Sequence, residues 1–263
     1  MSIQRINAMI IRYMYVWFRS IERFMWSFGW PFLDLIIWGI TSSYLQKQSI
    51  TSFSIVTFIL GGVIFWNILW RAQNEMSVNF LEEAWNHNLI NIFSSPLKIS
   101  EYLISAIILN LIKLIVTVTT LTVSAFVLYK FNFYTTFGWH IPFLLINLLL
   151  IGWSAGIFIN ALLLRYGWSL SELAWAIVFV LQPFSCVFYP REALPVWAQK
   201  ISLILPSSYV FEEMRSILFS GNINWFNLYL SFGLNLVYLV LSIKFFYYMY
   251  DRARDLGKLV KLN

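Results

Sequence analysis

Ionisable side chains interrupt two long apolar stretches of this 263-residue sequence. Asp34 and Lys113 each lie about eight to ten residues inside such a stretch, and so at similar depths if both stretches are membrane-spanning helices. A charge near the centre of a bilayer costs about 2.5–3.5 kcal/mol and usually has a partner or a water-filled cavity. We therefore hypothesise an Asp34–Lys113 ion pair. Snorkelling of Lys113 to the interface explains the same pattern equally well.

The longest polar interval of the chain runs from Arg71 to Pro96 and has the periodicity of a helix. One side of this helix carries the apolar residues Leu81, Ala84, Trp85, Leu89 and Ile92, and Glu82, Glu83, Asn86 and His87 lie mostly elsewhere. Ser95 and Pro96 should end the helix, because proline disfavours helical backbone in the residue before it. The interval is either a solvated linker that only joins two spans or a surface that soluble machinery grips.

Catalytic and nucleotide-binding motifs are missing from the sequence. None of the eleven glycines forms a G-x-x-x-x-G-K-S/T loop, and neither H-E-x-x-H nor G-x-S-x-G occurs. His87 and His140 lie far apart, and the single cysteine, Cys186, excludes an intramolecular disulfide or a cysteine-based metal cluster. We predict a chain with no catalytic residues, no metal site and no cofactor. Any energy from ATP must come from another polypeptide.

The composition is that of a membrane protein. Hydrophobic residues make up 60% of the chain and charged residues only 11%, so most of the apolar surface must face lipid or other spans. Aromatic residues, at 19%, suit membrane interfaces and the surfaces between helices. The net charge of +6 is spread along the chain, which fits contact with anionic lipid better than binding of nucleic acid.

Residues 1–25 have the pattern of an amphipathic helix. Four arginines share one side of this helix: Arg5, Arg12, Arg19 and Arg23. The opposite side carries the apolar residues Ile3, Ile6, Ile10, Tyr13, Met14, Trp17, Ile21 and Phe24. A basic stripe behind an apolar face indicates a helix that lies in the membrane interface. A soluble helix packed on a partner is the alternative.

Six apolar stretches are long enough to be spans: 26–44, 53–70, 102–128, 141–164, 170–188 and 225–250. Pro31 breaks the first near its start, and Gly61-Gly62 marks a close-packing or kink point in the second. Gly152 and Gly156 form a small-xxx-small pattern for helix packing in the fourth. We expect a single domain. Its segments are 1–25 (interfacial helix), 26–70 (spans 1–2), 71–100 (cytoplasmic loop), 101–188 (spans 3–5), 189–224 (external hairpin), 225–250 (span 6) and 251–263 (cytoplasmic tail).

An even number of spans places both termini on one side of the membrane. That side would hold eleven basic residues: Arg5, Arg12, Arg19, Arg23, Arg71, Lys98, Arg165, Arg252, Arg254, Lys258 and Lys261. The other side would hold five: Lys47, Lys130, Arg191, Lys200 and Arg215. The positive-inside rule therefore places both termini and the 71–96 interval in the cytoplasm.

The interval 189–224 contains two helix-like segments too short to cross a membrane. The first is Glu192 to Leu205; Pro206 stops it, and Tyr209 to Phe219 begins the second. Two half-length helices after a span indicate a re-entrant hairpin in the outer leaflet, where protein or a water-filled cavity must cover the non-helical backbone. A pair of helices lying flat on the outer surface is the alternative.

The order of these parts resembles the permease subunit of ABC-2-type ABC transporters. Two motifs carry the resemblance. One is FLEEAWNHNLINIFSSPL at 80–97, similar to the family's acidic helix followed by S-P-L. The other is VFYPREALPVW at 187–197, continuing to Leu205-Pro206 and Met214-Arg215, similar to the family's F-Y-P…L-P-x-W…P…R pattern. Many members have an E-x-G-T-like turn ahead of S-P-L, whereas Glu82-Glu83-Ala84-Trp85 here continues a helix without glycine.

The resemblance implies an all-α integral membrane protein with six transmembrane helices, an N-terminal interfacial helix, a cytoplasmic coupling helix and an external re-entrant hairpin. Two copies would form the pathway in the bacterial inner membrane, above two copies of a separate ATPase that binds ATP and magnesium. The expected ATPase-coupling residues are Glu82, Glu83, Trp85, His87 and Asn88. The expected external gate comprises Tyr189, Pro190, Leu194, Pro195, Trp197, Pro206 and Arg215.

Such transporters export drugs, lipids or lipid-linked polysaccharides, so the expected cargo is hydrophobic or amphiphilic. A membrane protein that serves structure or assembly without transport is the alternative. The two differ in their partner, because a transporter subunit should copurify with an ATPase and stimulate it.

Overall fold

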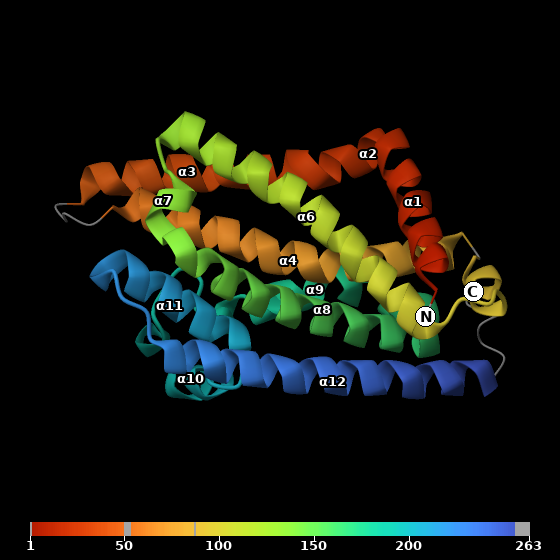
Figure 1. The fold of residues 1–263 in the computed structure, drawn as a ribbon. Coiled ribbons are helices and arrows are strands. Elements are labelled where there is room, and N and C mark those ends of the chain that lie inside the picture. Colours follow the sequence, from red (N-terminus) through yellow and green to blue (C-terminus); the bar gives the residue numbers. More distant parts are fainter. Residues whose placement is uncertain (1, 50–53, 87, 256–263) are drawn as a thin grey trace.

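The computed structural model describes residues 2–49, 54–86 and 88–255, and every regular element within these ranges is a helix (Figure 1). The long helices are α3 (Trp30–Gln48), α4 (Ile55–Trp85), α6 (Ile99–Tyr129), α8 (Ile141–Tyr166) and α12 (Trp225–Asp255). The shorter α-helices are α1 (Ile3–Arg19), α2 (Ile21–Phe24), α5 (Leu89–Ser94), α7 (Phe133–Phe137), α9 (Leu173–Leu181), α10 (Val196–Ser202) and α11 (Pro206–Ser220). A π-helical turn, η1 (Met25–Gly29), joins α2 to α3.

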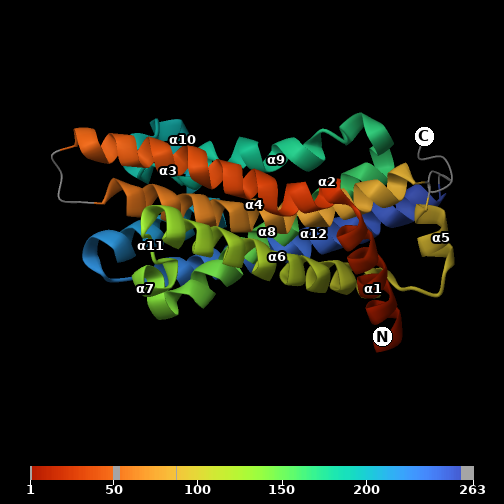
Figure 2. The same ribbon diagram turned by 90° about the horizontal axis from the view of Figure 1, so that it is seen from above.

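The long helices run side by side along one axis, as Figures 1 and 2 show from two directions. Helix α1 crosses one end of this bundle, and α5 and the C-terminal end of α12 lie at the same end. Helices α7, α10 and α11 lie towards the other end. The bundle therefore has two distinct ends, and one of them carries both the N-terminal helix and the last turns of α12.

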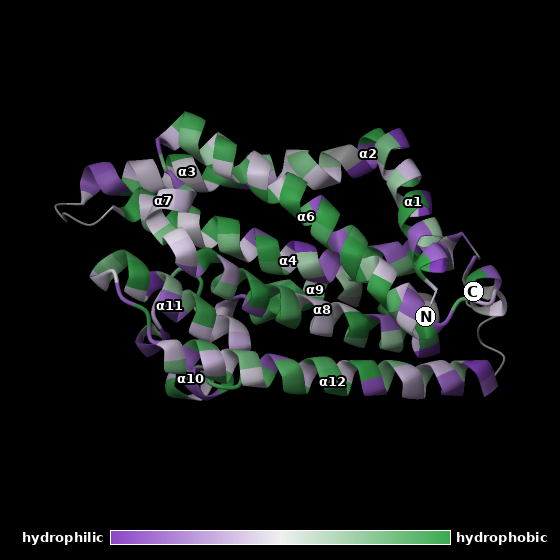
Figure 3. Ribbon diagram, in the orientation of Figure 1, coloured by the Kyte–Doolittle hydropathy of each residue, from purple (hydrophilic) through white to green (hydrophobic). Residues whose placement is uncertain are grey.

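Four segments are long and apolar enough to cross a membrane: Ile55–Glu83, Ile99–Tyr129, Phe133–Tyr166 and Trp225–Asp255. Figure 3 shows the apolar residues along them, with polar residues gathered towards their ends and in part of α4. The protein is therefore membrane-embedded, and these segments include four of the six predicted spans. Helix α3 has 19 residues, and its crossing of the membrane remains a prediction.

The predicted fifth span, 170–188, is not one continuous helix. Helix α9 has 9 residues and is about 14 Å long, roughly half the thickness of a bilayer core. A 3-10 turn, η4 (Pro183–Ser185), follows it, and Cys186 has a left-handed backbone with φ 57°. Proline lacks the N–H that a continuing helix needs, which explains why the α-helix ends before Pro183.

The polar interval that begins at Arg71 is not a separate loop, because α4 continues without interruption as far as Trp85. Its polar side chains between Arg71 and Asn79 are buried against other helices. These side chains therefore form a polar interior of the bundle. In the sequence, the same run of polar residues looks like a segment that faces water. The short helix α5 follows and ends at Ser94, directly before Ser95-Pro96, as predicted.

Helices α4 and α8 approach closely at the small-xxx-small pattern. A Cβ atom added to Gly152 would lie 2.5 Å from the Cβ of Ala72, and one added to Gly156 would lie 2.6 Å from the Cβ of Met76. Neither contact is sterically possible, so glycine at both positions permits the observed helix separation. The prediction that this pattern packs a helix is confirmed, and the partner helix is α4.

Helix α1 packs one face against the bundle. Its buried side chains are Ile6, Met9, Tyr13 and Trp17, spaced three or four residues apart as on one face of a helix. Other apolar side chains of α1, including Ile3 and Phe18, are exposed. The helix thus presents apolar surface outward as well as inward, which suits a position in contact with lipid.

The two helices of the predicted external hairpin have different bounds from those expected. The first, α10, is shorter than Glu192 to Leu205, and the second, α11, begins at Pro206 itself. Proline suits the first turn of a helix, where its missing N–H would have no partner. Helix α11 ends at Ser220 and packs against α12 and α8. The residue that caps it, Gly221, has a φ of 68°, which glycine adopts readily.

Candidate functional site

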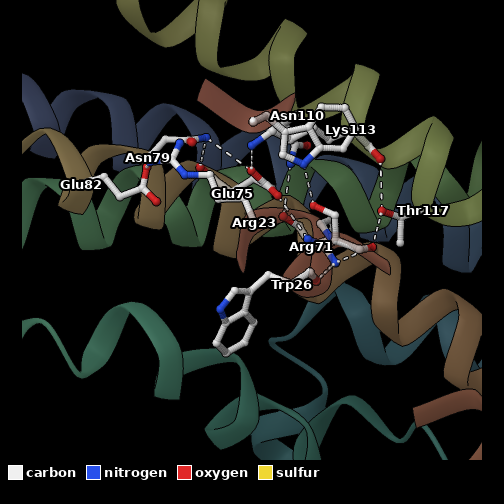
Figure 4. Close-up of polar contacts among 11 residues, drawn as sticks. Arg23, Trp26, Arg71, Glu75, Asn79, Glu82, Asn110, Lys113 and Thr117 are labelled. Atoms are coloured by element: carbon white, nitrogen blue, oxygen red, sulfur yellow. Dashed lines mark hydrogen bonds and ion pairs between the residues drawn. The ribbon is translucent and has the colours of Figure 1, made fainter. Parts of the chain in front are cut away.

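Three buried charges from two helices form the centre of the candidate site (Figure 4). Arg71 and Glu75 lie one turn apart on α4, and Arg71 Nη1 is 3.1 Å from Glu75 Oε1. Lys113 of α6 places Nζ 2.5 Å from the other oxygen, Glu75 Oε2. All three residues are at most 8% exposed. Glu75 therefore binds two cations at once, which compensates for the removal of its carboxylate from water.

The ion network also reaches the π-helical turn η1. Arg71 Nη2 donates to the carbonyl oxygens of Trp26 and Ser27, at 2.8 and 3.2 Å. Thr117 of α6 donates to the same Ser27 oxygen at 3.3 Å, and Trp17 of α1 donates to Ser27 Oγ at 2.9 Å. The turn between α2 and α3 is thus bonded to α1, α4 and α6. A movement of α1 and α2 would be transmitted to these helices through it.

The hypothesised Asp34–Lys113 pair is wrong, because Lys113 has Glu75 as its partner. Asp34 instead accepts a hydrogen bond from Asn67 Nδ2 at 3.0 Å. The error follows from the assignment of Glu75 to a loop, which removed the correct partner from consideration. The spacing of Arg71 and Glu75, four residues apart, was the available signal for a helical ion pair in this segment.

A cleft lined mainly by aromatic rings lies between α3, α4 and α9, and we call it the tryptophan cleft. Its volume is about 570 Å³. Its lining consists of Trp26, Trp30, Pro31, Asp34, Trp38, Val63, Trp66, Asn67, Trp70, Trp175, Phe179, Gln182 and Phe188. The ring centroid of Trp26 lies 5.3 Å from that of Trp175, so η1 and α9 meet at one end of the cleft. Aromatic faces with a few polar groups suit an apolar or sugar-bearing molecule.

A second cavity, the charged pocket, adjoins the tryptophan cleft and has a volume of about 650 Å³. Trp26 and Trp175 line both cavities. Its lining consists of Val16, Trp17, Arg19, Ser20, Glu22, Arg23, Trp26, Ser27, Arg71, Asn74, Glu75, Val78, Asn79, Glu82, Trp85, Asn86, Lys113 and Trp175. The ion network thus forms part of the wall of a cavity that shares Trp26 and Trp175 with the aromatic one.

The acidic residues expected to couple to an ATPase bind the N-terminal helices. Glu82 pairs with Arg23 of α2 at 2.7 Å, and Glu83 pairs with Arg12 of α1 at 2.8 Å. Asn88 Nδ2 also donates to Glu83, at 2.6 Å. These contacts join the end of α4 to α1 and α2. Any force applied to either part would therefore act on both.

Two other residues named for coupling have different positions. Trp85 is 43% exposed at the end of α4, whereas His87 lies outside the described residues.

On helix α1, burial raises the pKa of Tyr13 well above its ordinary value, because desolvation disfavours the phenolate. The ring of Tyr13 therefore stays neutral where it packs between α1 and the bundle.

Arg215 of α11, one of the residues expected at the external gate, is buried and bonded to neighbouring segments. Arg215 Nη1 donates to the carbonyl oxygen of Cys186 at 2.9 Å, and Nη2 is 2.8 Å from Glu212. Glu212 in turn accepts from the backbone N–H of Arg191 at 2.8 Å. The hydroxyl of Tyr189 donates to the carbonyl oxygen of Pro183 at 2.7 Å. Arg215 thus ties the loop after α9 to α11.

The remaining gate residues border α10 and α11. Pro190 precedes a 3-10 turn, Pro195 is the residue before α10, and Pro206 opens α11. Leu194 accepts a hydrogen bond at its carbonyl oxygen from Gln199. Trp197 is 62% exposed, and its ring contacts Phe184. The structure therefore divides the predicted gate into a buried part around Arg215 and an exposed part on α10.

The fold and the site define a membrane-embedded helical protein with an ion network beside an aromatic cleft. The family model described as ABC-2 type transporter matches residues 4–219. The chain belongs to the ABC-2 type transporter family. No curated protein sequence matches it.

Proposed function

We propose that this chain is the membrane permease subunit of an ABC exporter, driven by ATP hydrolysis in a separate ATPase subunit. The observation that carries the proposal is the family match over residues 4–219. The cargo moves outward and is amphiphilic or hydrophobic: a lipid-linked glycan, a lipid or a drug. This chain supplies the pathway, and ATP and magnesium bind to the partner.

The geometry supports a mechanical role for the end of the bundle that carries α1. The ion pairs Glu82–Arg23 and Glu83–Arg12 join the end of α4 to α1 and α2. The bonds of Arg71 to Trp26 and Ser27 join the same region to the beginning of α3. An ATPase that moved α1 or the end of α4 would therefore shift Trp26, a wall residue of the tryptophan cleft.

The proposal includes an orientation and a second copy of the chain. The basic residues of α1 and the last turn of α12 lie at one end of the bundle, which we place in the cytoplasm of a bacterium, with the chain in its inner membrane. Two copies form the complete pathway, in contact with membrane lipids, and nucleic acid is not a partner.

Isolation of the tagged chain from its native membranes tests the proposal. The purified sample should carry a magnesium-dependent, vanadate-sensitive ATPase. Trp85→Ala should reduce the bound ATPase activity, because Trp85 is exposed at the end of α4 beside α1 and α2. The matched control is Trp139→Ala, which changes an exposed tryptophan directly after α7, towards the other end of the bundle, and should leave the bound ATPase unchanged.

A folded wild-type chain that carries no ATPase, even after crosslinking in the membrane, would contradict the proposal. A role in membrane structure or assembly would then explain the chain better. Equal loss of ATPase in both tryptophan variants would contradict the assignment of the docking end.

A further inference from the structure

We propose that the charged pocket binds the phosphate-bearing headgroup of an anionic amphiphile while the tryptophan cleft holds the apolar part next to it. This inference rests on the proposed transport function and adds the chemical class of the cargo and its position. Its starting point is that the two cavities meet at Trp26 and Trp175. One ligand that extends past these two rings would occupy both cavities.

The charges around the pocket leave one positive charge in excess. Four cationic residues line it, namely Arg19, Arg23, Arg71 and Lys113, against three carboxylates, Glu22, Glu75 and Glu82. Glu75 is already bound by Arg71 and Lys113, and Glu82 is bound by Arg23. Two of the three carboxylates are thus neutralised within the protein. An anion of the ligand would balance the remaining positive charge in a site of reduced polarity.

Donor groups without acceptors indicate what the ligand must offer. Among the described residues, no acceptor is present for Arg71 Nε, Asn74 Nδ2 or Trp70 Nε1. Arg71 is 2% exposed and Asn74 is 6% exposed, and both line the charged pocket. Trp70 lines the tryptophan cleft, and the Arg71 guanidinium lies 5.6 Å from the centroid of its ring. Buried donors are normally satisfied, so three in adjacent walls point to a ligand rich in acceptor oxygens.

A phosphate group meets these requirements better than a neutral headgroup. It carries negative charge and several strong acceptor oxygens, and arginine recognises it well. The tryptophan cleft next to it offers aromatic faces and few polar groups, which suits the acyl or isoprenoid part of a lipid. The carboxylates of Glu75 and Glu82 would repel the phosphate if their cations were removed, so the existing ion pairs also prepare the pocket for it.

Lipid binding to the purified chain tests the inference without ATP or transport. Phosphatidic acid with brominated acyl chains quenches tryptophan fluorescence on close approach and serves as the probe. Unbrominated phosphatidic acid should reverse this quenching, and diacylglycerol with the same chains should need about a hundredfold more, because it lacks the charge-assisted hydrogen bonds. Comparable competition by diacylglycerol would overturn the inference. So would competition by inorganic phosphate at the same concentration as phosphatidic acid, since the apolar part would then contribute nothing.

A variant of the pocket supplies the second test. Asn74→Leu removes a donor with no acceptor in the protein, so the fold loses no hydrogen bond of that group. It should weaken phosphatidic acid binding by about tenfold or more, as expected for one lost hydrogen bond to a charged group. The matched control, Asn91→Leu on α5, makes the same change outside both cavities and should bind as the wild type does. Unchanged binding by a folded Asn74→Leu variant would overturn the inference.

The two proposals can fail separately. Selective phosphatidic acid binding by a chain that carries no ATPase would contradict only the transport function. If the chain carries an ATPase but binds phosphatidic acid and diacylglycerol equally well, only the headgroup site would be contradicted.

Discussion

Lys113 of α6 and Glu75 of α4 form an ion pair at 2.5 Å within two helices that are each long and apolar enough to cross a membrane. Arg71 shares the same carboxylate and bonds the backbone of η1. One acidic side chain thus connects α4 and α6 with the turn that leads from α1 and α2 into α3. The stability of this end of the bundle should depend on Glu75.

Glu75→Gln should lower the stability of the folded chain strongly. Loss of this carboxylate leaves Arg71 and Lys113 buried without a counter-charge, and breaking a buried ion pair costs about 3–5 kcal/mol. The unfolding temperature in detergent measures the effect, with size-exclusion chromatography used to monitor the loss of folded protein. Glu192→Gln is the control because Glu192 is exposed and should tolerate the change. Equal unfolding temperatures for the two variants would show that the network adds no stability.

Gly152→Leu should separate α4 from α8. Even the Cβ of the new side chain would meet the backbone oxygen of Leu69 at 2.8 Å, and backbone cannot move aside as a side-chain end can. We expect a large loss of folded protein, since overpacking a tight contact costs about 1–3 kcal/mol or more. Gly233→Leu on α12 is the matched control, because a Cβ there meets nothing within 4 Å. The yield of monodisperse protein separates the two, and similar yields would refute the close approach.

Glu83→Gln should loosen α1 without unfolding the chain. The pair with Arg12 is partly exposed, and pairs of this kind contribute about 0–1 kcal/mol. Amide hydrogen exchange in α1 should become faster, while exchange in α8 stays the same. Glu22→Gln, at an exposed position of α2, should change neither rate. Unaltered exchange of α1 in Glu83→Gln would mean that its apolar face alone holds it.

Cysteine accessibility in intact cells should show opposite exposure for the two ends of the bundle. In a Cys186→Ser background, Asn132→Cys and Ser220→Cys should react with a membrane-impermeant maleimide from outside. Arg5→Cys and Asp255→Cys should react only after permeabilisation, because α1 and the end of α12 lie at the other end. Labelling of Arg5→Cys in sealed cells would reverse the orientation.

The sequence was sufficient for the all-helical membrane character because apolar stretches of span length are visible without tertiary information. Gly152 and Gly156 were also recognisable, since their spacing alone predicts a packing face. The ion network of Arg71, Glu75 and Lys113 could not be recognised from the sequence. Glu75 lies in a run of polar residues that looks water-facing, and only the packing of α3, α6, α8 and α9 against α4 buries that run.

The tryptophan cleft was equally beyond prediction, although tryptophans were abundant. Its lining residues come from positions as distant as Trp26 and Phe188, and periodicity cannot show which helices stand side by side. The break after α9 was missed because apolar composition continued through Pro183. A proline within an apolar stretch signals either a kink or an end, and tertiary context decides between them.

ATP hydrolysis in liposomes tests the central claim most directly. The ATPase that copurifies with the chain is assayed alone and after reconstitution with the wild-type chain at equal concentration. The proposed permease function predicts faster hydrolysis in the presence of the chain. A rate equal to that of the ATPase alone, with folded chain present in the same vesicles, would contradict it.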